Sequence, residues 1–362
     1  DWYRKAAKKK LDELRRTIPA AKLADAQLAI AREHGFSSWR ALNKHMSSAS
    51  AHVPAFFDAI VAGDRARVEQ MLDQHPQLTL LKNDHGSTAL HVAAENDDRA
   101  ITRILLERGA KVDDRFGDSG HSALSWALTV RSFHAADAMV RGGVEPDLFC
   151  AAGLGDVIRI RSFFDESGHL KDKASKTGSS RFGSDGNRIP IPPATKREMI
   201  SDALYLASRN GMVEAVRELL THDPDVMFPA FLGASPLHWS YFGYEPRVAA
   251  LLIAAGANPA ARDPIYRCTP KAFGICVAAS WGIQHLIEKQ LDADPSLANI
   301  AQGRGTPLHE AARAGQVRAV QLLLQRGANR DARDADGLTP LNLAQREKHN
   351  AVIAILQASP SS

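Results

Sequence analysis

Residues 83–115 hold the clearest pattern of apolar and polar positions in the chain, with the sequence NDHGSTALHVAAENDDRAITRILLERGAKVDDR. Small and aliphatic residues recur three or four positions apart in two short segments, which predicts a pair of helices joined by a polar turn. Thr88 stands where a side chain can cap the first helix, and Gly109 supplies a positive-φ residue after the second. The alanine pair at 93–94 is small enough to let the helices pack closely.

The leucine of this pattern returns along the chain at a nearly constant spacing. It occurs as Leu90, Leu124, Leu204, Leu237, Leu308 and Leu341, 33 or 34 residues apart wherever no insertion intervenes. The segments 235–238 (SPLH) and 306–309 (TPLH) are further copies of the start of the first helix. This period and these motifs resemble the ankyrin repeat. The resemblance implies an all-α ankyrin-repeat solenoid of about nine repeats.

The N-terminal part is predicted to form helices that precede the repeats. Its segment LADAQLAIAREHGFSSWRAL is similar to a helical lead-in found before ankyrin arrays in bacterial proteins. Two short helices with a glycine turn also allow a DNA-binding helix-turn-helix, but a cap over the first repeat is what the end of a solenoid needs. Because Asp1 is not an initiator residue, we expect the native chain to begin upstream of it.

The pattern divides the chain into four parts. They are an N-terminal helical cap (1–50), repeats one to four (54–165), an insertion loop (166–199) and repeats five to nine (200–357). The insertion lacks hydrophobic periodicity and is rich in Gly, Ser, Lys and Pro, so it is predicted to be either a mobile surface loop or a lid over the neighbouring groove.

Composition and charge favour a chain that works in a reducing compartment and binds neither membrane nor nucleic acid. The net charge is +4, but residues 1–50 hold eleven Lys or Arg against five Asp or Glu, so the repeats carry no basic stripe. No apolar run approaches the roughly 18 residues of a membrane span. The three cysteines, Cys150, Cys268 and Cys276, have no disulfide or metal-ligand spacing. We therefore expect a cytoplasmic protein with no metal and no cofactor.

No established catalytic motif is present. The chain has no GxGxxG, Walker loop, GxSxG or CxxC, and the sequence His309-Glu310-Ala311-Ala312-Arg313 has arginine where a zinc-binding HExxH needs its second ligand. In the family that the chain resembles, the histidines at 91, 238 and 309 hold the turn to the helix. His121 and Asp263, on predicted finger turns, are the candidates for acid–base chemistry, although neither has a visible partner.

Two functions follow from the residues expected to face the groove. The resemblance favours a scaffold that binds a protein partner through the concave groove, with His85, His121 and Tyr266 on the finger turns as contacts. The alternative is a small-molecule-binding protein or enzyme, because the departures from the repeat gather in the middle of the chain. Its pocket would lie between the irregular repeats and the insertion, and would be lined by Arg209, Trp239, Phe242, Tyr266 and Trp126. Arg209 would recognise an anion.

Overall fold

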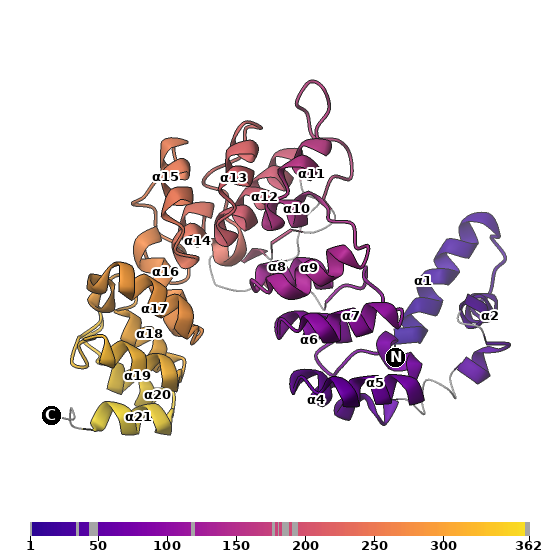
Figure 1. Ribbon diagram of the computed structural model, residues 1–362, viewed down its shortest axis with the longest axis horizontal. Coiled ribbons are helices and arrows are strands. Elements are labelled where there is room, and N and C mark those ends of the chain that lie inside the picture. Colours follow the sequence, from indigo (N-terminus) through magenta and orange to yellow (C-terminus); the bar gives the residue numbers. More distant parts are fainter. Residues whose placement is uncertain are drawn as a thin grey trace. The chain divides into compact units, whose positions relative to one another are not determined.

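The computed structural model describes residues 2–33, 36–42, 50–116, 120–175, 178–179, 181–182, 188–189 and 195–358. Within these ranges the chain is helical, apart from turns and one hairpin of two-residue strands, β1 (Arg181–Phe182) and β2 (Arg188–Ile189). The predicted all-α repeat architecture is confirmed (Figure 1). The chain folds as two compact units, Asp1–Glu145 and Pro146–Ser362, which we describe separately.

The first unit begins with a helical hairpin, α1 (Trp2–Thr17) and α2 (Leu23–Glu33). Its small core includes Ala7, Ile30 and Leu42. Leu81, which follows the helices of the first repeat, packs against this core. The hairpin therefore contacts the first repeat.

Three helix pairs complete the first unit. They are α4 (Val53–Val61) with α5 (Arg65–Gln74), α6 (Ala89–Glu95) with α7 (Arg99–Glu107), and α8 (Ala123–Thr129) with α9 (Phe133–Arg141). A 3-10 turn, η1 (Pro76–Leu80), follows α5. The first helices of successive pairs pack on one another, as do the second helices, so the core runs from repeat to repeat.

The second unit contains six helix pairs in its described residues. They are α10 (Leu148–Leu154) with α11 (Val157–Ser162), α12 (Lys196–Asn210) with α13 (Val213–Leu220), α14 (Pro236–Phe242) with α15 (Pro246–Ala254), α16 (Pro270–Ser280) with α17 (Gln284–Ala293), α18 (Pro307–Arg313) with α19 (Val317–Gln325), and α20 (Pro340–Arg346) with α21 (Asn350–Gln357). Two 3-10 turns, η3 (Phe231–Gly233) and η4 (Pro295–Asn299), lie between pairs. The described residues thus hold nine pairs, the predicted number of repeats.

In two repeats, a histidine links the first helix to the turn of the next repeat. In the second repeat, Thr88 Oγ1 lies 2.7 Å from His91 Nδ1, and His91 Nε2 lies 3.1 Å from the His121 carbonyl oxygen of the following repeat. His309 forms the same link to the Leu338 carbonyl at 3.0 Å. These side chains join neighbouring repeats, which is the structural role that the family resemblance implies.

The insertion differs from the continuous loop expected over residues 166–199. Phe164 forms a β-bridge with Leu170, and the buried Ala174 carbonyl accepts a hydrogen bond from Leu148 N at 2.8 Å, so the first part is an ordered finger turn. The last four residues are the first turn of α12, because Thr195 forms a capping box with Glu198. Residues 176–177, 180, 183–187 and 190–194 lie outside the described residues.

Two contacts attach the described part of the insertion to the second unit. The backbone N–H of Ser179 donates to the Asp202 carboxylate at 3.1 Å, and the Ser179 hydroxyl donates to the same group. Strand β1 lies against η3, in the turn before α14. The described part of the insertion therefore contacts repeats five and six.

Leu105→Ala should lower the free energy of unfolding by about 2 to 5 kcal/mol, because the leucine side chain is fully buried on α7 and its loss leaves a cavity. Denaturant unfolding followed by circular dichroism measures this. Val61→Ala is the control in the same unit, since Val61 is 64% exposed. Equal effects of the two substitutions would contradict the assigned register.

The buried histidines make stability depend on pH. Burial lowers the pKa of His91 from 6.5 to about 4. Since the folded state then binds fewer protons than the unfolded chain, this stability is complete above pH 6.5 and is lost as the pH falls towards 4. From pH 7 to pH 5 the loss attributable to His91 should be about 2 kcal/mol.

In the last repeat, Asn342 occupies the position equivalent to His91. The Asn342 Oδ1 atom accepts a hydrogen bond from the backbone N–H of Thr339 at 3.0 Å. His91→Asn should therefore keep part of the cap while removing the titrating group. Urea midpoints at pH 7 and pH 5 should lie closer together in this variant than in the parent chain. An unchanged separation would show that His91 is not the group responsible.

Candidate functional site

Carboxylate and amide side chains shape the finger turns that precede the first helices. Asn83 Oδ1 accepts from the backbone N–H groups of His85 and Ser87, at 3.1 and 2.9 Å. Asp334 Oδ1 accepts in the same way from residues 336 and 338. Such Asx turns fix the backbone at the finger, so the surface they present is preformed.

Asp263, a predicted acid–base candidate, is one of these turn-forming residues. Its carboxylate accepts backbone N–H groups from Ile265, Tyr266 and Cys268 at 3.0, 2.6 and 2.8 Å. Burial raises the pKa of Asp263, while these hydrogen bonds oppose the rise. The carboxylate is buried beneath its own turn, so its observed role is to hold the finger in place.

His121, the other acid–base candidate and a predicted partner contact, is only 3% exposed. Its Nδ1 lies 3.2 Å from Ser125 Oγ. Ser125 occupies the position where other repeats carry histidine. Trp126 packs near the rings of His121 and Phe116, at centroid distances of 6.0 and 5.3 Å. Of the predicted contacts on the first unit, His85 is the exposed one.

Arg209, Trp239 and Phe242 do come together, as predicted for a pocket. The Arg209 guanidinium carbon lies 4.4 Å from the Trp239 ring and 4.7 Å from the Phe242 ring. The exposed fractions of the three residues are 4, 0 and 1%. The side chains pack directly on one another, so this group is a desolvated cation–π cluster within the repeat core.

Two further residues belong to this cluster and were not predicted. Trp281 on the turn after α16 lies 5.7 Å from the Arg209 guanidinium carbon. Tyr205, one turn before Arg209 on α12, is fully buried, and burial raises the pKa of its hydroxyl to about 12. The sequence signal for Tyr205 is its spacing of four residues from Arg209, which places the two side chains on one face of a helix.

Tyr266 belongs to a different group of side chains. It contacts Phe273, whose ring lies 5.2 Å from Trp239, so the tyrosine reaches the aromatic cluster only through this intermediary. On its other side, the Arg304 guanidinium carbon lies 4.8 Å from the Tyr266 ring. Tyr266 thus joins the aromatic core to a polar network.

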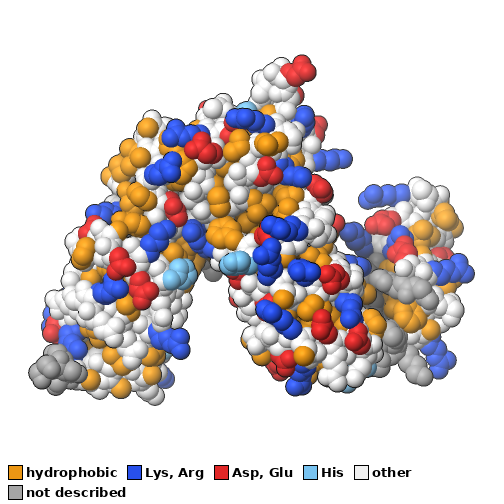
Figure 2. Space-filling view, in the orientation of Figure 1, with side chains coloured by type: hydrophobic (Ala, Val, Ile, Leu, Met, Phe, Trp, Pro, Cys, Tyr) orange, Lys and Arg blue, Asp and Glu red, His pale blue; other side chains and the backbone are white. Residues whose placement is uncertain are grey.

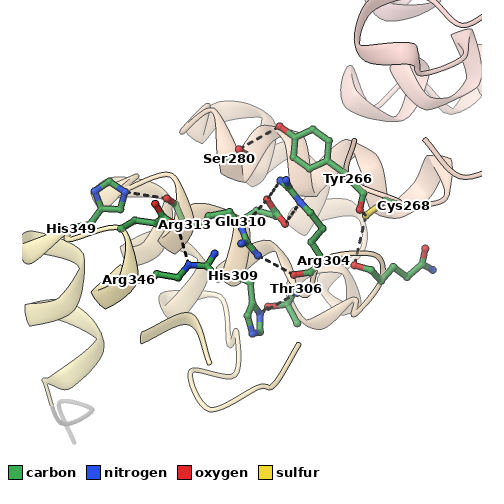
Figure 3. A network of polar contacts seen from close by, with 12 residues as sticks. Tyr266, Cys268, Ser280, Arg304, Thr306, His309, Glu310, Arg313, Arg346 and His349 are labelled. Carbon is green, nitrogen blue, oxygen red and sulfur yellow. Dashed lines mark hydrogen bonds and ion pairs between the residues drawn. The ribbon is translucent and has the colours of Figure 1, made fainter. Parts of the chain in front are cut away.

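The polar network is centred on Glu310 of α18 and is drawn in Figure 3. Both carboxylate oxygens accept from Arg304, at 3.2 Å from Nε and 2.6 Å from Nη2. Arg313 Nε lies 4.0 Å from the same carboxylate, and the Arg313 carbonyl lies 3.0 Å from His349 Nε2. Two guanidinium groups are therefore placed around a carboxylate that is 2% exposed.

A signal for this network is present in the sequence. Glu310 directly follows the repeat histidine, a position held by Val92 and Trp239 in other repeats. A charge at a position that is otherwise apolar requires a buried partner. Arg304, on the preceding finger turn, is that partner.

The finger turns of repeats seven to nine border a groove of about 600 Å³. Arg267, Arg304 and Arg313 line it together with Asp334 and Asp336. Its remaining lining residues are Leu232, Pro264, Ile265, Gly303 and Ala335. Charged groups of both signs and an apolar wall are thus presented together on preformed turns, a surface that can recognise a partner by hydrogen bonds and ion pairs.

Comparison with known families agrees with this architecture. The model of three successive ankyrin repeats matches residues 56–149 and 275–361, and the single ankyrin-repeat model matches residues 232–264. The helix pairs, finger turns and repeat histidines define a repeat solenoid, and the chain belongs to the ankyrin-repeat family. Ankyrin repeats generally mediate protein–protein interaction.

Several relatives share parts of this array. The chain is 22% identical to the E3 ubiquitin-protein ligase KEG of Arabidopsis thaliana over 77% of its own length and 17% of that protein. It is 33% identical to the mitochondrial disaggregase of Bos taurus over 43% of its length and 22% of the relative. Rabankyrin-5 of Homo sapiens is 46% identical over 15% of the chain and 5% of the relative. The chain thus spans less than a quarter of each.

The described residues hold neither a metal-binding cluster nor a membrane-spanning helix. No group of three or more His, Cys, Asp or Glu side chains in these ranges is arranged to hold a metal ion. None of the helices in the same ranges has both the length and the apolar character needed to cross a membrane.

Glu310→Gln should destabilise the second unit by about 1 to 3 kcal/mol, because the half-buried Arg304 and Arg313 side chains lose the charge of the buried carboxylate between them. Thermal or denaturant unfolding measures the change. Glu347→Gln provides the matched control: its exposed carboxylate pairs with Arg346 at 3.1 Å, and its loss should change stability by less than about 0.5 kcal/mol. A similar loss in both variants would argue against the buried network.

Proposed function

We propose that this chain is an interaction scaffold that binds a protein partner across its finger turns and first helices. The observation that carries the proposal is the groove on the fingers of repeats seven to nine, which combines charged side chains of both signs with an apolar wall. Membership of the ankyrin-repeat family supports it, because stacked repeats present an extended surface to partners.

The groove is rigid, which favours specific recognition. Gly303 adopts a φ of +58°, and a Cβ atom there would collide with the Tyr266 carbonyl oxygen of the preceding finger. Arg304 is held by both Glu310 oxygens. A partner would therefore meet side chains that are already ordered, and less conformational entropy would be lost on binding.

Arg267 and Asp336 are the charged groups best placed for initial contact. Both are exposed and line the groove, Arg267 from the turn before α16 and Asp336 from the turn before α20. Tyr266, a predicted contact, is buried below Arg267, so its contribution is to support the finger. On the first unit, His85 is an exposed residue of a finger turn, as Arg267 and Asp336 are on the second.

The small-molecule alternative rests on the cluster of Arg209, Trp239 and Phe242. A ligand in that place would have to displace side chains that already pack on one another, and a buried guanidinium among aromatic rings is explained by core stability. The scaffold is therefore the better-supported function. The three cysteines are buried thiols, which supports a reducing compartment such as the cytoplasm as its location.

The double reversal Arg267→Glu/Asp336→Lys should weaken partner binding at least about tenfold while leaving net charge unchanged, because two exposed charged groups of the groove change sign. Partners are recovered from a host lysate with the parent chain, identified, purified and titrated against each variant by calorimetry. Stability of the variant is checked by thermal unfolding.

Glu288→Lys/Arg318→Glu is the matched control. It reverses two exposed charges on the second helices α17 and α19, away from the fingers, again without a change in net charge. Binding should be unaffected. If this control abolishes binding and the groove variant retains it, the partner uses the second-helix face and the proposed groove is wrong.

A further inference from the structure

We propose that the tip of the α1–α2 hairpin, residues 15–25, binds the surface of an anionic lipid bilayer without crossing it. This surface is separate from the finger groove, and the proposal does not rest on the scaffold function. It is carried by the exposed apolar side chains of the tip and by the basic groups that surround them.

Two large aliphatic side chains are exposed within this short turn. Ile18 is 56% exposed and Leu23 is 41% exposed. The described residues contain six strongly exposed large hydrophobic side chains, and the other four are scattered over the repeats at Val61, Ile158, Met227 and Ile253. Among these six, only Ile18 and Leu23 at the hairpin tip lie within five positions of each other in the sequence.

Basic side chains flank the two aliphatic residues. Arg15, Arg16 and Lys22 are exposed on the same turn, whose acidic member is Asp25. The Asp25 carboxylate accepts the Lys22 backbone N–H at 2.8 Å, and Arg15 Nε donates to the Ala21 carbonyl at 3.3 Å. Figure 2 shows basic and hydrophobic side chains side by side on this hairpin.

The tip is presented by a folded support. Ala21 and Ala26 are buried at the base of the turn, and Lys10 Nζ lies 2.6 Å from Glu33 across the two helices. The aliphatic side chains are therefore held outward at the end of a packed hairpin.

Aliphatic side chains beside basic ones match one kind of surface. In an interfacial site, apolar groups enter the boundary between head groups and acyl chains while Lys and Arg contact anionic head groups. Nucleic acid would satisfy the positive charges and would leave Ile18 and Leu23 in water. Each basic group close to an anionic surface contributes about a fivefold gain in affinity, so three give binding that is measurable and sensitive to salt.

Vesicle co-sedimentation tests this with the whole chain. Vesicles with about 30% phosphatidylserine in phosphatidylcholine should bind the chain at low ionic strength, pure phosphatidylcholine should not, and ~0.5 M salt should release it. Ile18→Ser/Leu23→Ser should reduce binding at least about tenfold. Val61→Ser is the control, because Val61 is a more exposed aliphatic residue on another part of the same unit.

Insertion of the tip into the bilayer is measured separately, by the fluorescence of an environment-sensitive dye attached to the Ala20→Cys variant. Ala20 is exposed between the two aliphatic residues, while the three native cysteines are buried, so labelling is selective. The fluorescence should shift to the blue on phosphatidylserine vesicles. Three results would overturn the proposal: no binding to these vesicles, equal binding to neutral vesicles, or an equal loss of vesicle binding in the Val61 control. Each would indicate that the tip contacts a protein partner instead. Circular dichroism establishes that each variant is folded.

Discussion

Each repeat of this array is stable only against its neighbours, because two short helices cannot bury their apolar sides by themselves. The consequence is visible at Ala93, Ala94, Ala311 and Ala312, which are fully buried in the first helices of their pairs. Their small size permits the close approach on which the continuous core depends. Histidine side chains add a polar link of the same kind, since His91 and His309 each reach a carbonyl of the following repeat.

Local rules predicted the regular part of the fold well. Thr88 caps α6, Gly109 adopts a φ of +78° after α7, and the leucine spacing gave the number of helix pairs. These features depend on residues close together in the sequence, so a single repeat contains the information. The start of α12 inside the expected loop was missed, although the capping pair Thr195 and Glu198 marks it.

The candidate site was harder to predict because it depends on burial. Arg209, Trp239 and Phe242 were correctly grouped by their repeat positions, yet the repeat pattern does not show that they fill the space between them. Asp263 and His121 carry groups suited to catalysis, and only the structure shows that both hold turns. Conversely, Glu310 was dismissed as part of a false zinc motif, although an acid at an apolar repeat position requires a partner such as Arg304.

The final repeat differs from the interior ones in a way that affects how the array would come apart. His238 and His309 of the second unit have lowered pKa values because they are buried, whereas the corresponding residue of the last repeat is Asn342, which does not titrate. His309 Nε2 reaches the Leu338 carbonyl in the turn before α20, so mild acid weakens the joint between the last two described helix pairs. Acidification would therefore favour detachment of the α20–α21 pair, because the histidine that reaches its finger turn belongs to the pair before it.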